Sequence, residues 1–356
     1  MGSIDPEKLK TKAKLVFGAL GGAMTSAMIG LGDRLGLYRA MAGAGLLTSG
    51  EHAAKTGLHE RWVREWMYQQ GAAGVLEHRG EGRFELSTEA AALLAEEAHP
   101  AFGAGFFSHL PQTLAVAERL PESFLSGVGL PYDAFGPEGA RGIERGLGPW
   151  FRALLVPFVL PRLGDVVPPL QRGARAADVG CGAGVALLEL AKAFPASEFH
   201  GYDISQHALA RAEENRHVLG LTNAHFHDAA SEPLPEKAEF DFVTTFDCLH
   251  DMTDPASVIG AIRRSLRDDG LWLVCDIKAH GSFEANVERN PMAAMMYGMS
   301  VMICMSSALS EAGGLGLGAL GLHEALLREM ALAAGFSRVD PIDFGHPVNA
   351  FYLVHP

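Results

Sequence analysis

Acidic side chains close four successive apolar segments in the second half of the chain. In chain order they are Asp178, Asp203, Asp228 and Asp247. A histidine, His250, follows the last of them by three residues. Carboxylates accept hydrogen bonds from hydroxyl and amide groups, and histidine is the side chain that most readily exchanges a proton near neutral pH. The pattern predicts a polar ligand site in which His250 accepts or donates a proton.

A glycine-rich stretch follows the first of these acids. Gly180, Gly182 and Gly184 alternate with Cys181 and Ala183, and an apolar run at 185–194 then has the spacing of a helix. Glycine adopts backbone conformations that other residues avoid and lets a ligand approach the main chain closely. The stretch predicts a strand, a tight turn and a helix that cradle a nucleotide.

The segments around these residues have the order expected of an α/β fold. Apolar segments at 176–179, 198–202, 224–227 and 240–246 predict parallel strands of a doubly wound sheet, with helices between them. Ligands of such sheets bind at the carboxyl ends of the strands, where the acids lie. Asp203 stands nineteen positions after Gly184, which is typical of an acid that accepts hydrogen bonds from ribose hydroxyls.

The position of the third glycine separates a dinucleotide-binding turn from other nucleotide-binding turns. A dinucleotide fingerprint requires a glycine three residues after Gly182, and that position is Val185. The acids and glycines instead resemble the motifs of class I S-adenosylmethionine-dependent methyltransferases over residues 165–356. The resemblance implies S-adenosylmethionine as cofactor and S-adenosylhomocysteine as product. It implies that the cofactor is bound by Asp178, Gly180, Cys181, Gly182, Gly184, Asp203, Ile204, Asp228, Ala229, Phe246, Asp247 and Cys248.

A narrower resemblance concerns the segment Phe246–Pro255. It is similar to the His-Asp segment of small-molecule O-methyltransferases of the plant and polyketide-tailoring type, with Met252 where tryptophan is usual. The chain as a whole resembles bacterial two-domain methyltransferases more than it resembles the plant enzymes. This resemblance implies that His250 is the general base. We expect Glu324, on a helix at 323–334, to orient His250, and Asp251 to cap the next helix.

The acceptor atom is left open by the sequence. O-methylation is the first interpretation, and N- or S-methylation are alternatives. His250 and Asp251 with His280 or His323 also resemble the metal set of certain keto-acid C-methyltransferases, although no tight ligand spacing is present and no metal is predicted. A ligand-sensing winged-helix regulator without catalysis is the alternative outside enzymes.

An apolar substrate pocket is predicted from methionines and aromatic residues. Methionine surfaces adapt to flexible or aromatic ligands, and six methionines lie between residues 292 and 305. The residues assigned to this pocket are Tyr132, Phe135, Trp150, Met252, Met295, Met299 and Met302.

The first hundred residues have the pattern of a winged helix. Helices are expected at 49–55 and 60–70, a hairpin at 74–86 and a further helix from 88. The segment holds 11 Lys and Arg against 12 Asp and Glu, so it lacks the charge of a DNA-binding surface. The resemblance implies that this domain forms a homodimer. We therefore expect a dimerisation domain at 1–100, connecting helices that roof the active site at 101–165, and a catalytic domain at 166–356.

The composition of the chain limits its partners and its cellular compartment. The net charge of −13 argues against nucleic acid as a partner. Four cysteines without CxxC spacing are typical of reduced thiols, and no apolar signal core is recognised, so a cytoplasmic protein is expected. The apolar stretch 291–309 is interrupted by Gly298 and by serines, which disfavours a membrane span. Residues 7–42 have helical spacing, with an expected interruption at Gly18, Gly21 and Gly22.

Overall fold

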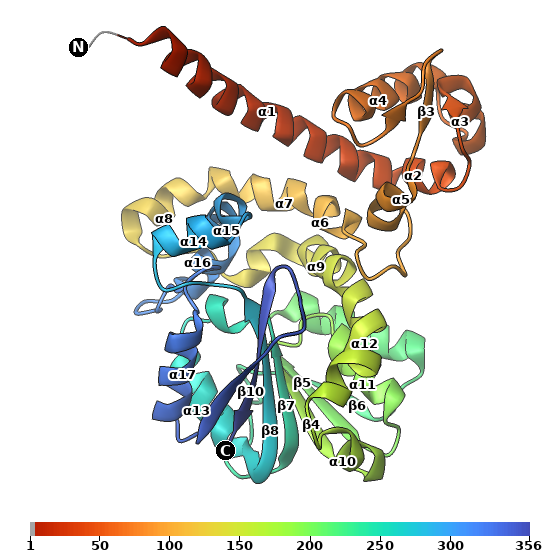
Figure 1. Ribbon diagram of the computed structural model, residues 1–356. Helices are drawn as coiled ribbons and strands as arrows, with labels where there is room; N and C mark the ends of the chain where they lie inside the picture. The colour runs from red at the N-terminus through yellow and green to blue at the C-terminus, as the bar shows by residue number, and fades with distance from the viewer. Residues whose placement is uncertain (1–3) are drawn as a thin grey trace. The chain divides into compact units, whose positions relative to one another are not determined.

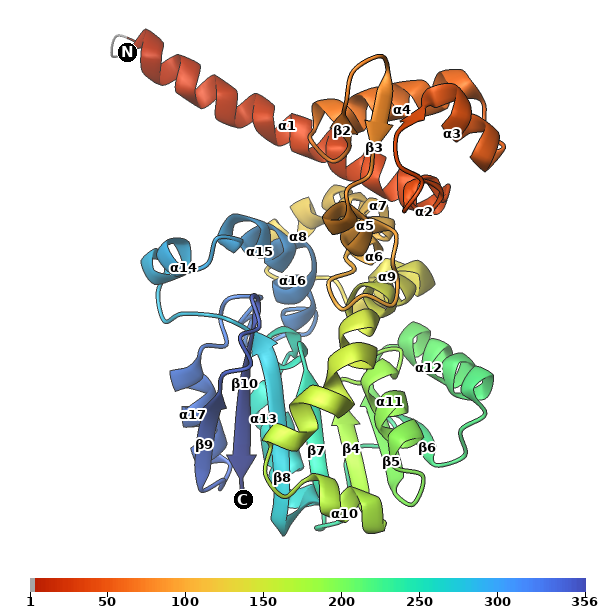
Figure 2. The same cartoon turned by 45° about the vertical axis from the view of Figure 1, so that its right-hand side comes forward.

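The computed structural model describes residues 4–356, which form two compact units. The first unit contains the chain to Pro111 together with Arg145–Trp150, and the second contains Gln112–Glu144 and Phe151–Pro356. The expected connecting segment 101–165 is thus divided between the two units. The ribbon is drawn in Figures 1 and 2.

The first unit is helical and carries a small three-stranded sheet. Its elements are α1 (Pro6–Arg34), α2 (Leu37–Met41), β1 (Leu47–Thr48), α3 (Ser49–Thr56), α4 (Glu60–Ala72), β2 (Glu77–His78), β3 (Arg83–Glu85), α5 (Thr88–Leu94) and α6 (Ala104–Ser108). The sheet has the order β1-β3-β2. At the start of α3, Thr48 and Glu51 form a reciprocal capping box, which explains why the helix begins there. Two helices followed by a β-hairpin confirm the predicted winged helix.

The expected interruption of the first helix is wrong. α1 continues through Gly18, Gly21 and Gly22, and nothing lies within 4 Å of a Cβ at these positions. Each glycine costs a helix about 1 kcal/mol relative to alanine. The alanine, leucine and methionine residues around them are good helix formers, and Asp5 caps the first turn. The pattern of isolated glycines therefore weakens this helix without ending it.

The second unit begins with short helical segments and continues into an alternating α/β region. Before the sheet lie α7 (Leu110–Ala115, which starts in the first unit), η1 (Val116–Glu118), α8 (Leu120–Ser126), η2 (Tyr132–Phe135), α9 (Gly136–Trp150, which ends in the first unit), η3 (Phe151–Val159), η4 (Leu160–Arg162) and α10 (Val167–Arg172). The elements that follow are β4 (Arg175–Val179), α11 (Val185–Ala193), β5 (Glu198–Asp203), α12 (Gln206–Leu219), β6 (Ala224–Asp228), β7 (Phe240–Phe246), η5 (Leu249–Asp251), α13 (Pro255–Ser265), β8 (Leu266–Ile277), α14 (Phe283–Arg289), α15 (Ala293–Met299), η6 (Ser300–Cys304), α16 (Met305–Ala308), α17 (Glu324–Ala333), β9 (Arg338–Ile342) and β10 (Asn349–His355).

A seven-stranded sheet organises this unit. Its order is β6-β5-β4-β7-β8-β10-β9, with β10 antiparallel to both of its neighbours. β4 pairs in parallel with β5 and β7, so their carboxyl ends lie at one edge of the sheet. Figure 2 shows α11 and α12 beside β5 and β6, and α13 and α17 beside the strands at the other end of the sheet. The predicted α/β fold is confirmed.

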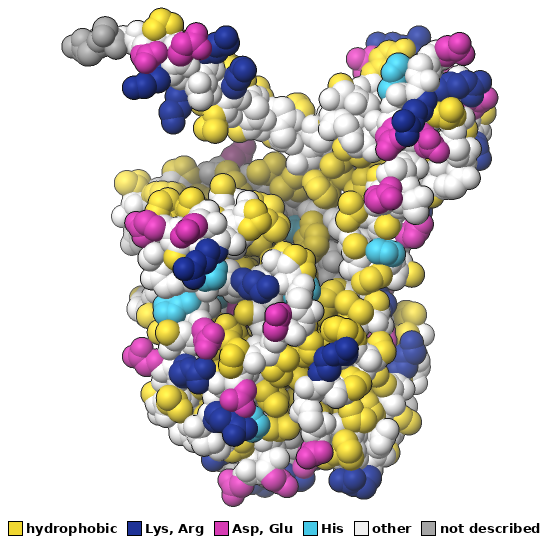
Figure 3. All heavy atoms as spheres, in the orientation of Figure 1, with side chains coloured by type: hydrophobic (Ala, Val, Ile, Leu, Met, Phe, Trp, Pro, Cys, Tyr) yellow, Lys and Arg dark blue, Asp and Glu magenta, His cyan; other side chains and the backbone are white. Residues whose placement is uncertain are grey.

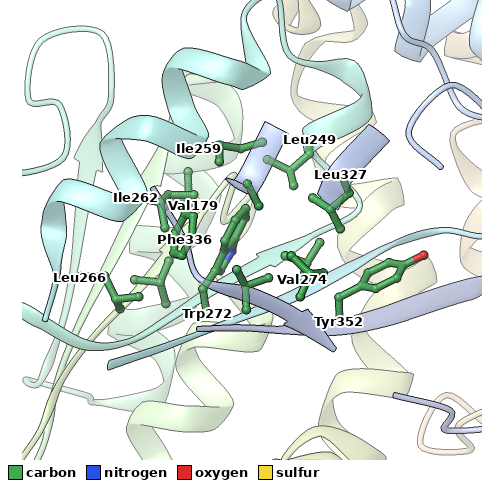
Figure 4. Close-up of a cluster of buried hydrophobic side chains, with 14 of the residues drawn as sticks. Val179, Leu249, Ile259, Ile262, Leu266, Trp272, Val274, Leu327, Phe336 and Tyr352 are labelled. Carbon is green, nitrogen blue, oxygen red and sulfur yellow. The ribbon is translucent and has the colours of Figure 1, made fainter. Parts of the chain in front are cut away.

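An apolar cluster of the second unit lies between strands of the sheet and helices α13 and α17. Trp272, Val274, Ile259 and Leu327 are at most 1% exposed, and Figure 4 shows these side chains directed toward one another. Burying such side chains contributes about 1.5–3 kcal/mol each. The cluster anchors β7 and β8, the two strands whose carboxyl ends carry the candidate catalytic residues.

Two histidines, His200 on β5 and His227 on β6, form a chain of contacts between the strands. Arg175 donates to Nε2 of His200, whose Nδ1 faces Nε2 of His227 at 3.1 Å, and Nδ1 of His227 faces Glu232 at 2.9 Å. Burial, then the positive charge of Arg175, lowers the pKa of His200 to about 4. The folded protein therefore holds this imidazole neutral in a pH range where an exposed histidine takes up a proton.

We expect the free energy of unfolding to fall as the pH is lowered from about 6.5 to about 4, because only the unfolded chain gains a proton at His200 in that window. The loss should reach roughly 1–2 kcal/mol at this partly exposed site. Urea unfolding of the wild type and of His200→Gln measures it. His217→Gln, on the exposed side of α12, is the control. An unchanged pH dependence in His200→Gln would contradict this assignment.

Candidate active site

The glycine turn after β4 combines close packing with an open position. The φ angles of Gly180, Gly182 and Gly184 are 73°, 55° and 75°, all in the left-handed region. A Cβ on Gly180 would lie 2.6 Å from Sγ of Cys248, whereas a Cβ on Gly182 would meet nothing within 4 Å. The turn is thus packed onto the end of β7 at Gly180 and leaves its backbone accessible at Gly182, as a ligand cradle requires.

Asp203, at the end of β5, is joined to this turn. Its Oδ2 accepts a hydrogen bond from the amide of Gly182 at 2.7 Å, and its Oδ1 accepts one from the amide of Ser205 at 2.8 Å. Burial raises the pKa of the Asp203 carboxyl, although these amides oppose the rise. Each carboxylate oxygen retains acceptor capacity, which fits the two hydroxyls of a ribose.

Asp178 lies beneath the turn and is 2% exposed. It accepts a hydrogen bond from the hydroxyl of Thr244 at 2.7 Å. Burial, with a contribution from the charge of Asp203, raises the pKa of Asp178 to about 7. A cation at the turn would favour the ionised carboxylate, so this group suits a ligand with positive charge.

The remaining predicted cofactor residues lie at the ends of β5, β6 and β7. Ile204 is 63% exposed, and the amide of Ala229 donates to the carbonyl of Asp203 at 2.9 Å. Asp228 ends β6, where its Oδ1 accepts from the amide of Ala230. In β7 and after it, Phe246 contacts the ring of Phe151 edge-on, and Sγ of Cys248 lies 3.1 Å from the carbonyl of Val179. Cys181 is buried after Gly180.

Asp247 has an unusual backbone at the end of β7. Its φ is 48°, a left-handed conformation that costs energy for a residue with a side chain. The side-chain amide of Asn349 donates to its Oδ1. Burial, with the charge of Asp276 next in size, raises the pKa of Asp247 to about 7. The strained position turns the chain toward the segment that carries His250.

His250 is paired with Asp276, the last acid of β8. Nδ1 of His250 lies 2.6 Å from Oδ1 of Asp276, and each residue is 2% exposed. Burial by itself lowers the pKa of His250, but the charge and hydrogen bond of Asp276 and a hydrogen bond with the Cys304 thiol outweigh it, so the pKa is raised well above its usual value. The carboxylate of Asp276 occupies Nδ1 and orients the ring, so a proton exchanged with a substrate would pass through Nε2 of a ring that also has the Cys304 thiol as a neighbour.

The structure does not bring Glu324 to His250. Glu324 is an exposed residue in the first turn of α17 and pairs with Arg328 at 3.0 Å. Asp276 was not among the site residues predicted from the sequence, although it lies one residue before the end of β8, the strand that follows His250. The rule that selected the other acids, a carboxylate at the carboxyl end of a parallel strand, would have found it.

Asp251 was expected to cap the following helix, but it does not. α13 is capped by Asp254, whose Oδ1 accepts from the amide of Ser257, because Asp254 directly precedes Pro255 at the first helical position. Asp251 instead lies in η5, where burial and the charges of Asp276 and Asp203, against that of His250, raise its pKa to about 7.

Part of the predicted apolar pocket forms one cluster. Tyr132, Phe135, Met299 and Met302 pack against buried residues of α15, η6 and the loop before α17. Burial, then the charges of Asp251 and Asp203, raises the pKa of Tyr132 well above its usual value, so its hydroxyl lies near the acidic site. Of the other predicted pocket residues, Met252 packs against the main core, Met295 is 47% exposed, and Trp150 belongs to the first unit.

Across residues 4–356, no group of three or more His, Cys, Asp or Glu side chains is arranged to hold a metal ion. His225 and His227 do not form a pair of free ligands, since each contacts a glutamate.

Comparison with known protein families identifies both units. Residues 170–316 match a family model described as a methyltransferase domain, and residues 23–96 match an Rv2258c-like winged helix-turn-helix domain. The second unit carries a methyltransferase domain. The family predicted from the motifs is thereby confirmed, with S-adenosylmethionine as the cofactor that this kind of domain uses.

Individual relatives agree with this assignment. A ubiquinone biosynthesis O-methyltransferase of Methylococcus capsulatus is 39% identical over 100 residues, which span 28% of this chain and 41% of that protein. A proposed O-methyltransferase of Nostoc punctiforme superposes with a TM-score of 0.74 at 17% identity, over the full length of both chains. Human N-acetylserotonin methyltransferase, solved with S-adenosylmethionine, gives 0.67 at 17% identity, over 100% of this chain and 99% of its own. These two structures share the fold.

Proposed function

We propose that the chain transfers the methyl group of S-adenosylmethionine to a hydroxyl of a small apolar or aromatic molecule. The observation that carries this proposal is the buried His250–Asp276 pair beside the glycine turn and Asp203. A hydroxyl must lose its proton to become a good nucleophile, and a histidine held by a carboxylate can receive that proton.

The residues assigned to the cofactor fit a nucleoside that carries a positive charge. Asp203 has acceptor capacity for ribose hydroxyls, Gly182 leaves room for the ligand, and Asp178 favours a cation. When bound, the cofactor supplies a methyl group already activated on a sulfonium. The protein then needs to align the acceptor, and such positioning can lower the barrier by ~7–11 kcal/mol.

His250 performs the proton step in this proposal. Nε2 accepts the proton of the substrate hydroxyl, while Nδ1–H remains hydrogen-bonded to Asp276 and the carboxylate stabilises the imidazolium that forms. The imidazole must be neutral at the start, and the nearby positive charge of a bound sulfonium favours the neutral ring. Tyr132, Phe135, Met299 and Met302 would enclose the apolar part of the acceptor.

Methyl-labelled S-adenosylmethionine tests the acceptor class. We expect the wild-type protein to label the hydroxyls of a panel of small phenols, detected by mass spectrometry as O-methyl ethers. Matched panels of aromatic thiols and amines serve as comparison. Label on amines or thiols alone would contradict O-methylation, and label on carbon next to a ketone would favour the C-methyltransferase alternative.

We further propose that the first unit joins two copies of the chain through α1. The exposed side chains of this helix include Leu15, Val16, Phe17 and Leu20, each at least 59% exposed. Exposed apolar surface of this extent marks an interaction site. Four lysines, at positions 8, 10, 12 and 14, precede this apolar part. Figure 3 shows basic side chains along the N-terminal part of the helix. Within residues 4–356, α1 is also the one helix long and apolar enough to cross a membrane, by length and composition only.

Light scattering at micromolar concentration should give twice the mass of one chain, which is 37.9 kDa. Phe17→Glu should shift the mass toward that of one chain, because a charge cannot be buried in an apolar interface without a partner. Lys12→Glu, in the same exposed helix, is the matched control. A single-chain mass for the wild type, or sedimentation of the protein with lipid vesicles, would contradict this role of α1 in a cytoplasmic dimer.

A further inference from the structure

We propose that Asp133 is a positioning residue that fastens a segment of the chain over the cofactor site and thereby links the cofactor to the substrate pocket. This inference rests on the proposed function. The segment, residues 128–135, is called the strap here. It precedes α9 and lies entirely within the second unit.

One end of the strap is attached to the elements that form the apolar pocket. The amide of Gly129 donates to the carbonyl of Leu309 at 2.9 Å, and the amide of Leu130 donates to the hydroxyl of Ser306 at 2.8 Å. A Cβ on Gly129 would lie 1.9 Å from the carbonyl oxygen of Ser306. This close approach leaves no room for a side chain at position 129, so the strap packs directly against α16.

The other end of the strap is attached beside the cofactor site. The carboxylate of Asp133 accepts a hydrogen bond from the hydroxyl of Ser205 and one from the amide of Gln206, the latter at 3.1 Å. Ser205 is buried, and its own amide donates to Asp203. Asp133 and Asp203 therefore hold the same residue, Ser205, through different atoms. The charge of Asp133 also contributes to the raised pKa of Asp203, in keeping with their closeness.

Tyr132 lies between these two attachments. Its ring packs with Phe135 at a centroid distance of 6.1 Å and against the buried apolar residues of α15 and η6, and its hydroxyl is near Asp251 and Asp203. Movement of Asp133 away from Ser205 would move the adjacent Tyr132 as well. Ribose hydroxyls bound at Asp203 would immobilise the loop that contains Ser205, and would thus favour the closed strap. The cofactor should therefore order the wall of the substrate pocket before the substrate binds.

A mere helix cap would have a different consequence. Asp133 could be regarded as a cap of α12, but Ser205 already caps that helix by accepting from the amide of Ala208 at 3.1 Å. Removal of a redundant cap would change stability and leave ligand binding and the response of the strap untouched. Measurements of the liganded protein distinguish these two roles.

Asp133→Ala tests this inference, with Glu138→Gln as control, because Glu138 is an exposed acid of α9 whose ion pair is with Arg141 of the same helix. We expect Asp133→Ala to weaken the binding of S-adenosylhomocysteine about tenfold in calorimetry, and Glu138→Gln to leave it unchanged. Hydrogen exchange should show that S-adenosylhomocysteine protects residues 128–135 in the wild type and much less in Asp133→Ala.

Two further variants keep the test decisive. Asp133→Asn keeps the shape of the side chain and one acceptor oxygen, so it should fold even if Asp133→Ala does not. Its affinity for S-adenosylhomocysteine should fall by less than the tenfold expected for Asp133→Ala, but measurably below that of the wild type. The double variant with Ser205→Ala should lose less affinity than the sum of the two single losses, because both changes remove the hydrogen bond between Ser205 and Asp133. Wild-type affinity together with wild-type protection in the Asp133 variants would overturn the inference alone. Failure of the wild type to bind S-adenosylhomocysteine would overturn the proposed function.

Discussion

Replacement of His250 by alanine should lower the rate of methyl transfer by about 100-fold or more while the affinity for S-adenosylhomocysteine changes little. The reason is that Nε2 of His250 is the proposed proton acceptor, whereas the cofactor is assigned to the glycine turn and Asp203. Single-turnover assays with a phenol identified by the labelling experiment would measure the rate. Full activity in this variant would remove His250 from the mechanism.

Asp276→Asn provides the companion measurement. The carboxylate raises the pKa of His250, so its removal should lower that pKa and move the limb of the pH–rate profile that depends on the neutral imidazole to lower pH. The wild-type rate should rise with pH through the same limb. Because Asp276 touches His250 and acts through it, a loss of rate without a displaced limb would assign Asp276 a structural role only.

Replacement of Asp203 by alanine should weaken binding of S-adenosylhomocysteine by roughly 1.5–3 kcal/mol, the scale of hydrogen bonds to a charged group. Asp203 also accepts from the amides of Gly182 and Ser205, so the turn would lose its partner at the same time. Asp203→Asn, which preserves the shape and one acceptor, should lose less. Undiminished affinity in both variants would contradict the assignment of the ribose to Asp203.

Local patterns in the sequence predicted most of the sheet that positions the site. β4, β5, β6 and β7 were each recognisable as an apolar run closed by polar residues, and the glycine turn marked the change to α11. These features depend on residues close together in the chain, which alternation and turn chemistry encode. The β-hairpin of the winged helix was predictable for the same reason.

Contacts between distant segments were not predictable in this way. Asp276 follows His250 by 26 residues, and Ser205 follows Asp133 by 72, so no periodicity relates them. Glu324 was predicted to orient His250 from its place at the start of a helix, but a helix boundary gives no indication of which way a side chain points. The continuity of α1 was missed because its three glycines were weighed without the good helix formers around them.

Calorimetric titration of the wild-type chain with S-adenosylhomocysteine, and in parallel with NAD, tests whether the glycine turn and Asp203 bind the methyltransferase cofactor. We expect one S-adenosylhomocysteine bound per chain, with NAD binding much more weakly or not at all, because Val185 replaces the third glycine of the dinucleotide fingerprint. Tighter binding of NAD, or no binding of S-adenosylhomocysteine, would contradict it.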